Sequence, residues 1–169
     1  MNEFKGYRNG VDLGGWLSQC GYEKEHIESF ITEADIARIA SWGCDHVRLP
    51  FDYNIILDDS GNVLESGLKL LERCADWCGV HGLSIILDLH KTMGFSFDKG
   101  EQESGFFEDQ RYQDIFVNLW SHIAKRFGNR NYVAFELLNE ITERRFAEIW
   151  NRIAARTITE IRRYAPDNF

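Results

Sequence analysis

A carboxylate and a carboxamide stand side by side at the end of an apolar run. The run at residues 135–138 leads directly into Asn139 and Glu140. A carboxyl group can give a proton to a leaving oxygen or take one from a nucleophile, and an amide can hydrogen-bond to a substrate hydroxyl. Asn139 and Glu140 are therefore the first candidates for acid/base chemistry in this chain.

Two further polar side chains follow apolar runs in the same way. Arg48 comes late in the run 44–49, and His90 directly follows the run 83–89. If these runs are parallel strands of a barrel, their carboxyl ends converge on one face, where such enzymes place their chemistry. We therefore predict one site that contains Arg48, His90, Asn139 and Glu140.

Each candidate also has a plainer explanation. Glu140 can be an exposed carboxylate at a strand end or an acid at a helix N-terminus, and Asn139 can cap the turn. A single histidine such as His90 is more often structural, and Arg48 can simply neutralise Glu136 inside the barrel. The recurrence of polar residues at successive strand ends favours a functional site.

The elements that must position these residues alternate along the chain. Apolar runs predict four strands, and amphipathic stretches predict four helices. The strands are expected at about 10–15, 44–49, 83–89 and 133–138, and the helices at about 32–42, 67–80, 109–127 and 143–164. Residues 19–28 are expected to form a polar loop, residues 55–64 a small hairpin, and Pro50 is expected to end the second strand.

Four strand and helix pairs in alternation predict a parallel sheet with right-handed crossovers. No glycine-rich phosphate loop follows the first strand, which disfavours a dinucleotide-binding fold. The polar strand ends favour a barrel instead. We therefore predict a single α/β domain over residues 1–169, with the (β/α)4 architecture of half a (β/α)8 barrel.

The composition excludes several classes of protein. The formal charge of −8 and the pI near 5.1 disfavour a nucleic-acid partner. No window approaches the roughly 20 apolar residues that a membrane span requires. The polar start of the chain is not expected to be a signal peptide, so its compartment stays open between the cytoplasm and secretion after processing.

The cysteines are expected to be reduced core thiols rather than disulfides. Cys74 and Cys78 are four residues apart in a predicted helix, and Cys44 opens a predicted strand. Tight Cys/His clusters of the kind that bind zinc are not found in the sequence. We expect neither a metal nor a cofactor.

Four motifs resemble, in order, the first half of a family 5 glycoside hydrolase of the bacterial endoglucanase C type. They are GGW at 14–16, HVRLPF at 46–51, DLH at 88–90 and FELLNE at 135–140. The resemblance covers essentially the whole chain. It implies a (β/α)8 barrel that hydrolyses β-1,4-glucans or related polysaccharides with retention of configuration.

The resemblance also implies roles for individual residues. Glu140 resembles the general acid/base, Asn139 the residue that holds the sugar 2-hydroxyl, and Arg48 and His90 the supporting residues of the central subsite. Lys91 stands where relatives often have a second histidine. Among the loop aromatics, Trp16 is kept as a weaker candidate for stacking on a sugar ring, although such residues usually pack.

The second carboxylate of glycoside hydrolysis is missing from this resemblance. In the family it follows the seventh strand, and only four strands are expected here. Four strands also leave two open edges and, we expect, an apolar inner face that must be covered. The simplest solution is a homodimer in which two copies close one barrel.

Such a dimer has consequences for catalysis. Glu140 would face its own copy across four strands, a geometry that fits a weak inverting site or none better than a retaining site. The predicted function is thus a glycoside hydrolase that acts weakly on β-glucan or an oligosaccharide. The alternative is an inactive half-barrel scaffold that self-associates and at most binds carbohydrate.

Overall fold

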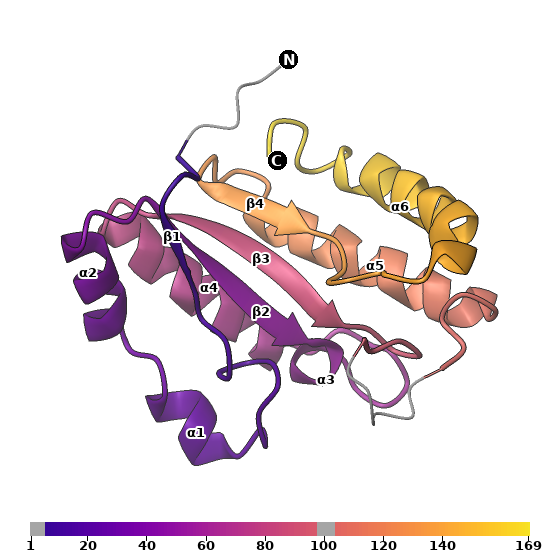
Figure 1. The fold of residues 1–169 in the computed structure, drawn as a ribbon, viewed down its shortest axis with the longest axis horizontal. Coiled ribbons are helices and arrows are strands. Elements are labelled where there is room, and N and C mark those ends of the chain that lie inside the picture. Colours follow the sequence, from indigo (N-terminus) through magenta and orange to yellow (C-terminus); the bar gives the residue numbers. More distant parts are fainter. Residues whose placement is uncertain (1–5, 98–103) are drawn as a thin grey trace.

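The computed structural model describes residues 6–97 and 104–169. Four parallel strands form one sheet in the order in which they occur in the chain (Figure 1). They are β1 (Gly10–Asp12), β2 (His46–Asp52), β3 (Ser84–Lys91) and β4 (Val133–Glu136). Because each connection leads to the next neighbour in one direction, the predicted α/β architecture of four parallel strands is confirmed.

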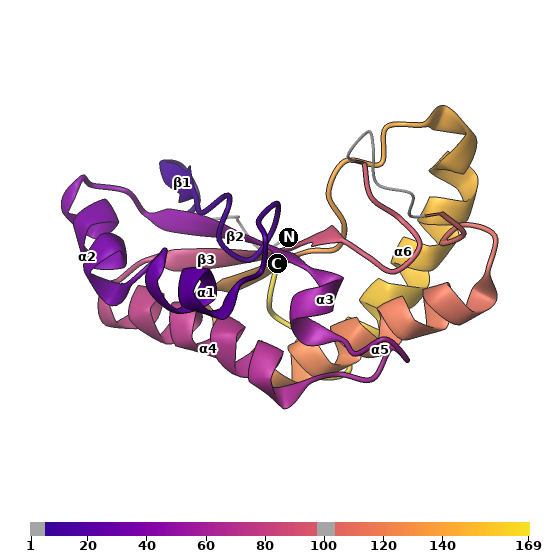
Figure 2. The same cartoon turned by 90° about the horizontal axis from the view of Figure 1, so that it is seen from below.

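The longer helices lie outside this sheet. Figure 2 shows α4 and α5 beneath one face, α2 and α6 towards the two edges, and the opposite face without helical cover. The helices are α1 (Lys24–Ser29), α2 (Glu33–Ser41), α3 (Tyr53–Ile56), α4 (Glu65–Val80), α5 (Gln110–Phe127), the 3-10 turn η1 (Arg144–Phe146) and α6 (Ala147–Ile161). Among the described residues, none of these helices is long and apolar enough to cross a membrane.

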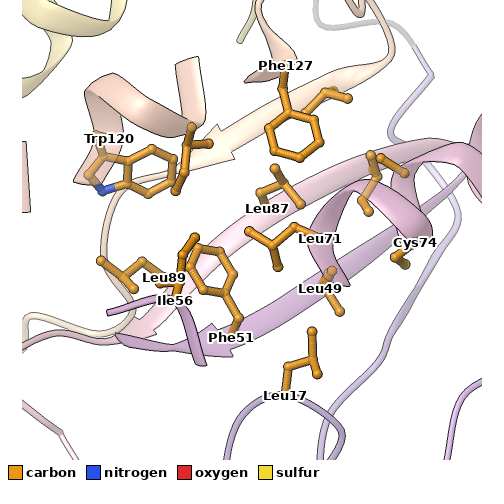
Figure 3. Packing of buried hydrophobic residues seen from close by; sticks show 14 of the residues in the cluster. Leu17, Leu49, Phe51, Ile56, Leu71, Cys74, Leu87, Leu89, Trp120 and Phe127 are labelled. Carbon is orange, nitrogen blue, oxygen red and sulfur yellow. The ribbon is translucent and has the colours of Figure 1, made fainter. Parts of the chain in front are cut away.

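The core fills the space between the sheet and the helices. Alternate residues of a strand point to the same face, and the odd-numbered residues of β2 and β3, up to Phe51 and Leu89, point towards α4 and α5. They are buried against apolar side chains that recur every three or four residues on the two helices (Figure 3). The contacts shown include Leu49, Phe51, Leu87 and Leu89 with Leu71, Cys74, Trp120 and Phe127.

Several local features are well defined, among them the expected hairpin and the expected free cysteines. The N-terminus of α2 carries a capping box, in which the Thr32 amide donates to Asp35 Oδ2 over 3.0 Å. In the expected hairpin, Leu57 and Val63 form an isolated antiparallel bridge. All four cysteines are free, and Cys74 and Cys78 are buried in α4.

Two boundary predictions are wrong. The expected loop 19–28 contains α1, a helix too short for its one buried residue, Ile27, to reveal a periodicity. β2 continues through Pro50 to Asp52. The Leu13 amide donates to the Arg48 carbonyl and the Asp52 amide donates to the Leu17 carbonyl. Pro50 thus faces the β1 side beyond the end of β1, where its missing N–H removes no ladder bond.

The expectation of an apolar inner face is also wrong. The even-numbered strand residues point away from α4 and α5, and most of them are polar. The strand register places Asp12 beside Arg48 in one layer, and Asp88 beside Glu136 in the next. The uncovered face of the sheet therefore carries paired charges rather than a hydrophobic surface.

Candidate active site

Arg48 is the centre of a network to which every strand of the sheet contributes one residue. Its Nε and Nη2 donate to the two carboxylate oxygens of Glu136 on β4, both over 2.8 Å. Its Nη2 also lies 2.9 Å from Asp88 Oδ2 on β3, and its Nη1 donates to Asp12 Oδ1 on β1 over 3.2 Å. One guanidinium thus contacts three carboxylates, one of them through two parallel hydrogen bonds that its planar fork can form and an ammonium cannot.

The plainer explanation of Arg48 expected a contact with Glu136, and the structure contains that contact. A residue held in this way can also border a sugar site, so Arg48 stays a candidate. The hydrogen bonds with Glu136 are the main cause that raises the pKa of Arg48 further above its ordinary value, against the opposing effect of burial. The cation is therefore permanent, and it organises the acidic groups around it.

His90 is joined to this network through Asp88. The Asp88 side chain is fully buried, and its Oδ2 lies 2.7 Å from His90 Nδ1. Burial raises the pKa of Asp88 to about 6, although the hydrogen bond with His90 and the charge of Arg48 oppose the rise. For His90, burial lowers the pKa, but the hydrogen bond and the charge of Asp88 outweigh burial, so its pKa is raised.

Asn139 completes the group. Its Oδ1 accepts a hydrogen bond from Arg48 Nη2 over 3.0 Å, and its Nδ2 lies 3.5 Å from His90 Nε2. Arginine has only donors, so the carbonyl end of the amide must face Arg48. The amino end of Asn139 is then directed towards His90.

Glu140 follows at the carboxyl edge of β4. The Asn139 amide still donates to the Leu89 carbonyl over 3.1 Å, and the chain then turns at Glu140, whose φ is 44°. A left-handed conformation of a non-glycine residue costs roughly 1 kcal/mol and persists where the surroundings enforce it. The Glu140 side chain is exposed to solvent. This placement fits a proton donor, and it fits the plainer explanation of an exposed strand-end carboxylate equally well.

Trp16 is not a sugar contact in this structure. It is fully buried, its Nε1 donates to the Ile27 carbonyl over 3.0 Å, and its ring stacks at 13° on Trp77. The prediction for Trp16 is therefore wrong, because the residue packs between the β1 loop and α4. Phe97 lies edge-on to His90, with ring centroids 5.8 Å apart.

A second polar cluster was not predicted. Asp52 ends β2, is 1% exposed, and accepts hydrogen bonds from Ser18 Oγ over 2.7 Å, from the Gln19 amide over 3.2 Å and from the Tyr22 hydroxyl. Lys91 Nζ lies 3.7 Å from its Oδ2. Lys91 was noted in the sequence. Asp52 was not considered, because the second strand was expected to end at Pro50, before Asp52.

No group of three or more histidine, cysteine or acidic side chains with the geometry of a metal site occurs within residues 6–97 and 104–169. The described site consists of a guanidinium, an imidazole, an amide and four carboxyl groups. Such a set can orient hydroxyl groups and exchange protons.

Comparison with known proteins adds independent information. The model of the family Cellulase (glycosyl hydrolase family 5) matches residues 8–169. Cellodextrinase A of Ruminococcus flavefaciens is 47% identical over 168 residues, which make up 99% of this chain and 50% of that protein. Endoglucanase C of Acetivibrio thermocellus is 44% identical over 160 residues, 92% of this chain and 46% of that protein. The chain thus spans about half the length of these relatives.

Solved structures show the same relation in three dimensions. The crystal structure of a glycoside hydrolase superposes with a TM-score of 0.81 at 22% identity, covering 96% of this chain and 51% of that one. XacCel5A in complex with cellopentaose superposes with a TM-score of 0.65 at 24% identity, covering 82% and 42%. The fold described above therefore corresponds to about half of these larger proteins.

Proposed function

Since this chain belongs to the cellulase family, glycosyl hydrolase family 5, we propose that it carries the acid/base half of a site that cleaves β-1,4-glucans or cello-oligosaccharides. In this proposal Glu140 is the general acid/base, and Asn139, Arg48 and His90 bind the sugar next to the scissile bond. The observation that carries the proposal is the four-strand network on Arg48, which also holds the side chain of Asn139, the residue before Glu140.

The geometry suits the chemistry of glycoside cleavage. A carboxylic acid must protonate the leaving oxygen, and a hydrogen bond to the sugar 2-hydroxyl strengthens as positive charge develops on the ring. Asn139 holds its carbonyl on Arg48, so its amino group can donate to that hydroxyl. Glu140 projects into solvent at the same edge, where it can reach a bound glycosidic oxygen.

The second carboxylate is proposed to come from a second half of the barrel. A retaining site holds its two carboxyl groups roughly 5–5.5 Å apart, and an inverting site roughly 6.5–9.5 Å apart. Asp12, Asp88 and Glu136 are all engaged by Arg48. None of the three is placed as a free nucleophile, so we expect weak activity, or none, from an isolated copy.

Both edges of the sheet offer apolar surface for such a half. A hollow of about 300 Å³ beside β1 includes Phe30 and Trp42, which are 49% and 65% exposed. A hollow of about 170 Å³ beside β4 includes Phe135, Leu137 and Ile158, the last 46% exposed. We propose that a second copy covers both edges, since a two-fold pair buries them together.

One contact limits how that second copy can pair. The Phe135 amide donates to the carbonyl of Phe169 over 2.8 Å, so the C-terminal segment already occupies part of the outer edge of β4. A partner strand can therefore add to β4 only beyond Phe135, or after residues 166–169 have moved away. The proposed dimer is expected to form less readily than one with a free edge.

A reducing-sugar assay on cellotetraose and on a soluble β-glucan tests the proposed function. We expect slow hydrolysis by the wild-type chain and its loss in Glu140→Gln. Glu143→Gln is the matched control, because Glu143 is an exposed acid three residues away that pairs with Arg145. Turnover that survives Glu140→Gln would show that Glu140 is not the acid/base.

The second candidate is a half-barrel that binds cello-oligosaccharides without cleaving them. The observation in its favour is that the chain spans half the length of its relatives. Calorimetric titration with cellotetraose distinguishes the two candidates. Binding by wild type and by Glu140→Gln, with hydrolysis by neither, supports the second candidate.

A further inference from the structure

Asp88 lies at the centre of the proposed site, and no role was predicted for it. It is 0% exposed, and its Oδ2 contacts both Arg48 Nη2 at 2.9 Å and His90 Nδ1 at 2.7 Å. Its other oxygen, Oδ1, is buried without a hydrogen-bond partner in the described part of the chain. A buried carboxylate with an unsatisfied oxygen is costly, so its presence requires an explanation other than stability.

The contact with His90 restricts where the imidazole proton can be. An ionised carboxylate only accepts hydrogen bonds, so the short contact requires a hydrogen on Nδ1. Neutral His90 then has a bare Nε2 that can only accept. That atom faces the amino group of Asn139, 3.5 Å away, at the carboxyl edge of the sheet.

A second histidine shows that the hydrogen-bond partner of each ring determines its tautomer. His26 Nε2 lies 2.7 Å from the carbonyl oxygen of Gly15. A carbonyl also only accepts, so His26 must carry its hydrogen on Nε2, the opposite tautomer from His90. The fold therefore imposes a different tautomer on each of these two side chains.

We propose that Asp88 is a positioning residue that holds His90 with its hydrogen on Nδ1 and so turns the Nε2 lone pair to Asn139 Nδ2, whose second hydrogen is left for a substrate hydroxyl. The last part rests on the proposed function. The same carboxylate oxygen also holds Arg48, which in turn holds the carbonyl end of Asn139. One buried oxygen thus orders an acceptor, His90 Nε2, next to a donor, Asn139 Nδ2.

Long-range ¹H–¹⁵N correlation spectra of the ¹⁵N-labelled chain at pH 8 test the tautomer directly. His90 is assigned with His90→Gln, and His26 serves as the reference for the opposite tautomer. We expect the wild-type spectrum to show His90 with a protonated Nδ1 and a bare Nε2. A wild-type His90 with its hydrogen on Nε2 would overturn the proposal without any variant of Asp88.

Two variants separate the hydrogen bond from the charge. Asp88→Asn retains a side-chain oxygen that can accept from Nδ1, so we expect the tautomer to persist while the pKa of His90 falls. Asp88→Ala removes the acceptor, so we expect the hydrogen to move to Nε2 in most molecules. An unchanged tautomer in a folded Asp88→Ala chain, with the His26 signals intact, would contradict the positioning role.

A titration with cellotetraose distinguishes this inference from the proposed function. If both hold, the sugar shifts the Nε2 resonance of wild-type His90, and the effect is lost in Asp88→Ala. A correct tautomer with no response to the sugar contradicts the proposed function and leaves the role of Asp88 intact. A response from a His90 that carries its hydrogen on Nε2 contradicts the role of Asp88 and supports sugar binding.

Discussion

At the scale of the residue, the main feature of the site is that one cation holds three acidic side chains. Arg48 alone contacts Asp12, Asp88 and Glu136, and Asp88 is fully buried. Burial favours the protonated form of the Asp88 carboxyl, and its pKa is therefore raised to about 6. The acidic cluster therefore has its lowest free energy when Asp88 and His90 share one proton.

The raised pKa of Asp88 predicts how the unfolding free energy changes with pH. A carboxyl whose pKa is raised by folding stabilises the fold below its unfolded pKa, and that contribution is lost as the pH rises towards the folded value. For Asp88 the loss occurs between about pH 4 and 6, and the raised pKa of His90 adds a loss in the same direction at higher pH. We expect the unfolding free energy of wild type minus that of Asp88→Asn to fall by about 2 kcal/mol from pH 4 to 7.

Urea unfolding of the two proteins at several pH values measures this difference. Taking the difference cancels the opposite trend of exposed carboxyls such as Asp35 and Asp58, whose pKa values are lowered by their hydrogen bonds. A difference that stays constant from pH 4 to 7, or that rises, would contradict a raised pKa for Asp88.

The residues of the site could be predicted only in part. Arg48, His90 and Asn139 were predictable because parallel strands bring their carboxyl ends together, whatever the details of packing. Asp88 was missed because one acid inside a buried apolar run shows no partner in the sequence. Trp16 was wrong because an aromatic residue beside a glycine turn has the same pattern whether it is exposed or fully buried.

At the scale of the element, Asp52 ties the loop after β1 to the end of β2. It accepts from Ser18, from the Gln19 amide and from Tyr22, and both Gln19 and Tyr22 have a positive φ, at 55° and 58°. The buried carboxylate thus offsets the strain of a left-handed loop. This tether could not be predicted, because a polar stretch of this composition also fits an untethered loop.

We expect Asp52→Ala to cost about 3 kcal/mol of unfolding free energy, because Lys91 and three hydrogen-bond donors each lose a contact with the same buried carboxylate. Amide exchange of residues 17–22 should accelerate more than that of β3. Glu28→Ala is the control, since Glu28 forms an exposed pair with Lys24 within α1 and its loss should cost less than about 1 kcal/mol. Equal losses in both variants would show that Asp52 does not hold the loop.

The contact between α3 and α4 gives a second prediction at this scale. A Cβ at Gly67 would lie 2.2 Å from the backbone oxygen of Ile55, and main-chain atoms cannot move aside cheaply. Glycine to alanine inside a helix normally stabilises by about 1 kcal/mol. Here we expect Gly67→Ala to destabilise by about 2 kcal/mol, because the clash forces α3 and α4 apart.

Gly79→Ala on the same helix is the matched control. Its new methyl group meets the hydroxyl end of Tyr132 at 2.9 Å, a side chain that can shift by a few tenths of an ångström. Thermal unfolding of the two variants should therefore show a clearly lower melting temperature for Gly67→Ala. The reverse order would contradict the close approach of α4 to the Ile55 carbonyl.

At the scale of the whole molecule, the charged open face removes one of the two expected reasons for dimer formation, an apolar inner face that must be covered. The sequence led us to expect an apolar inner face, but the register places Asp12, Arg48, Asp88 and Glu136 there, paired with one another. Periodicity alone could not reveal this. Charged residues within an apolar run are expected both for a strand with one charged face and for an apolar strand that carries a few active-site residues. Hydrophobic surface is found instead beside β1 and beside β4.

If these edges drive assembly, charges placed on them should prevent it. Trp42 lies beside β1 and Ile158 beside β4, and both side chains are exposed. Light scattering across a concentration series should show wild-type dimers that dissociate on dilution, since the Phe169 contact restricts pairing at β4. We expect Trp42→Glu and Ile158→Glu each to shift the protein to monomer, because burying an unpaired carboxylate costs several kcal/mol.

Val80→Glu is the control for this experiment, because Val80 is 73% exposed at the end of α4 and lines neither hollow. It should leave the mass of the particle unchanged. A folded wild-type monomer at every concentration would contradict the second copy as the partner, and the edges would then require a different covering chain. Dissociation by Val80→Glu, with Trp42→Glu still dimeric, would place the interface on the helical side of the sheet.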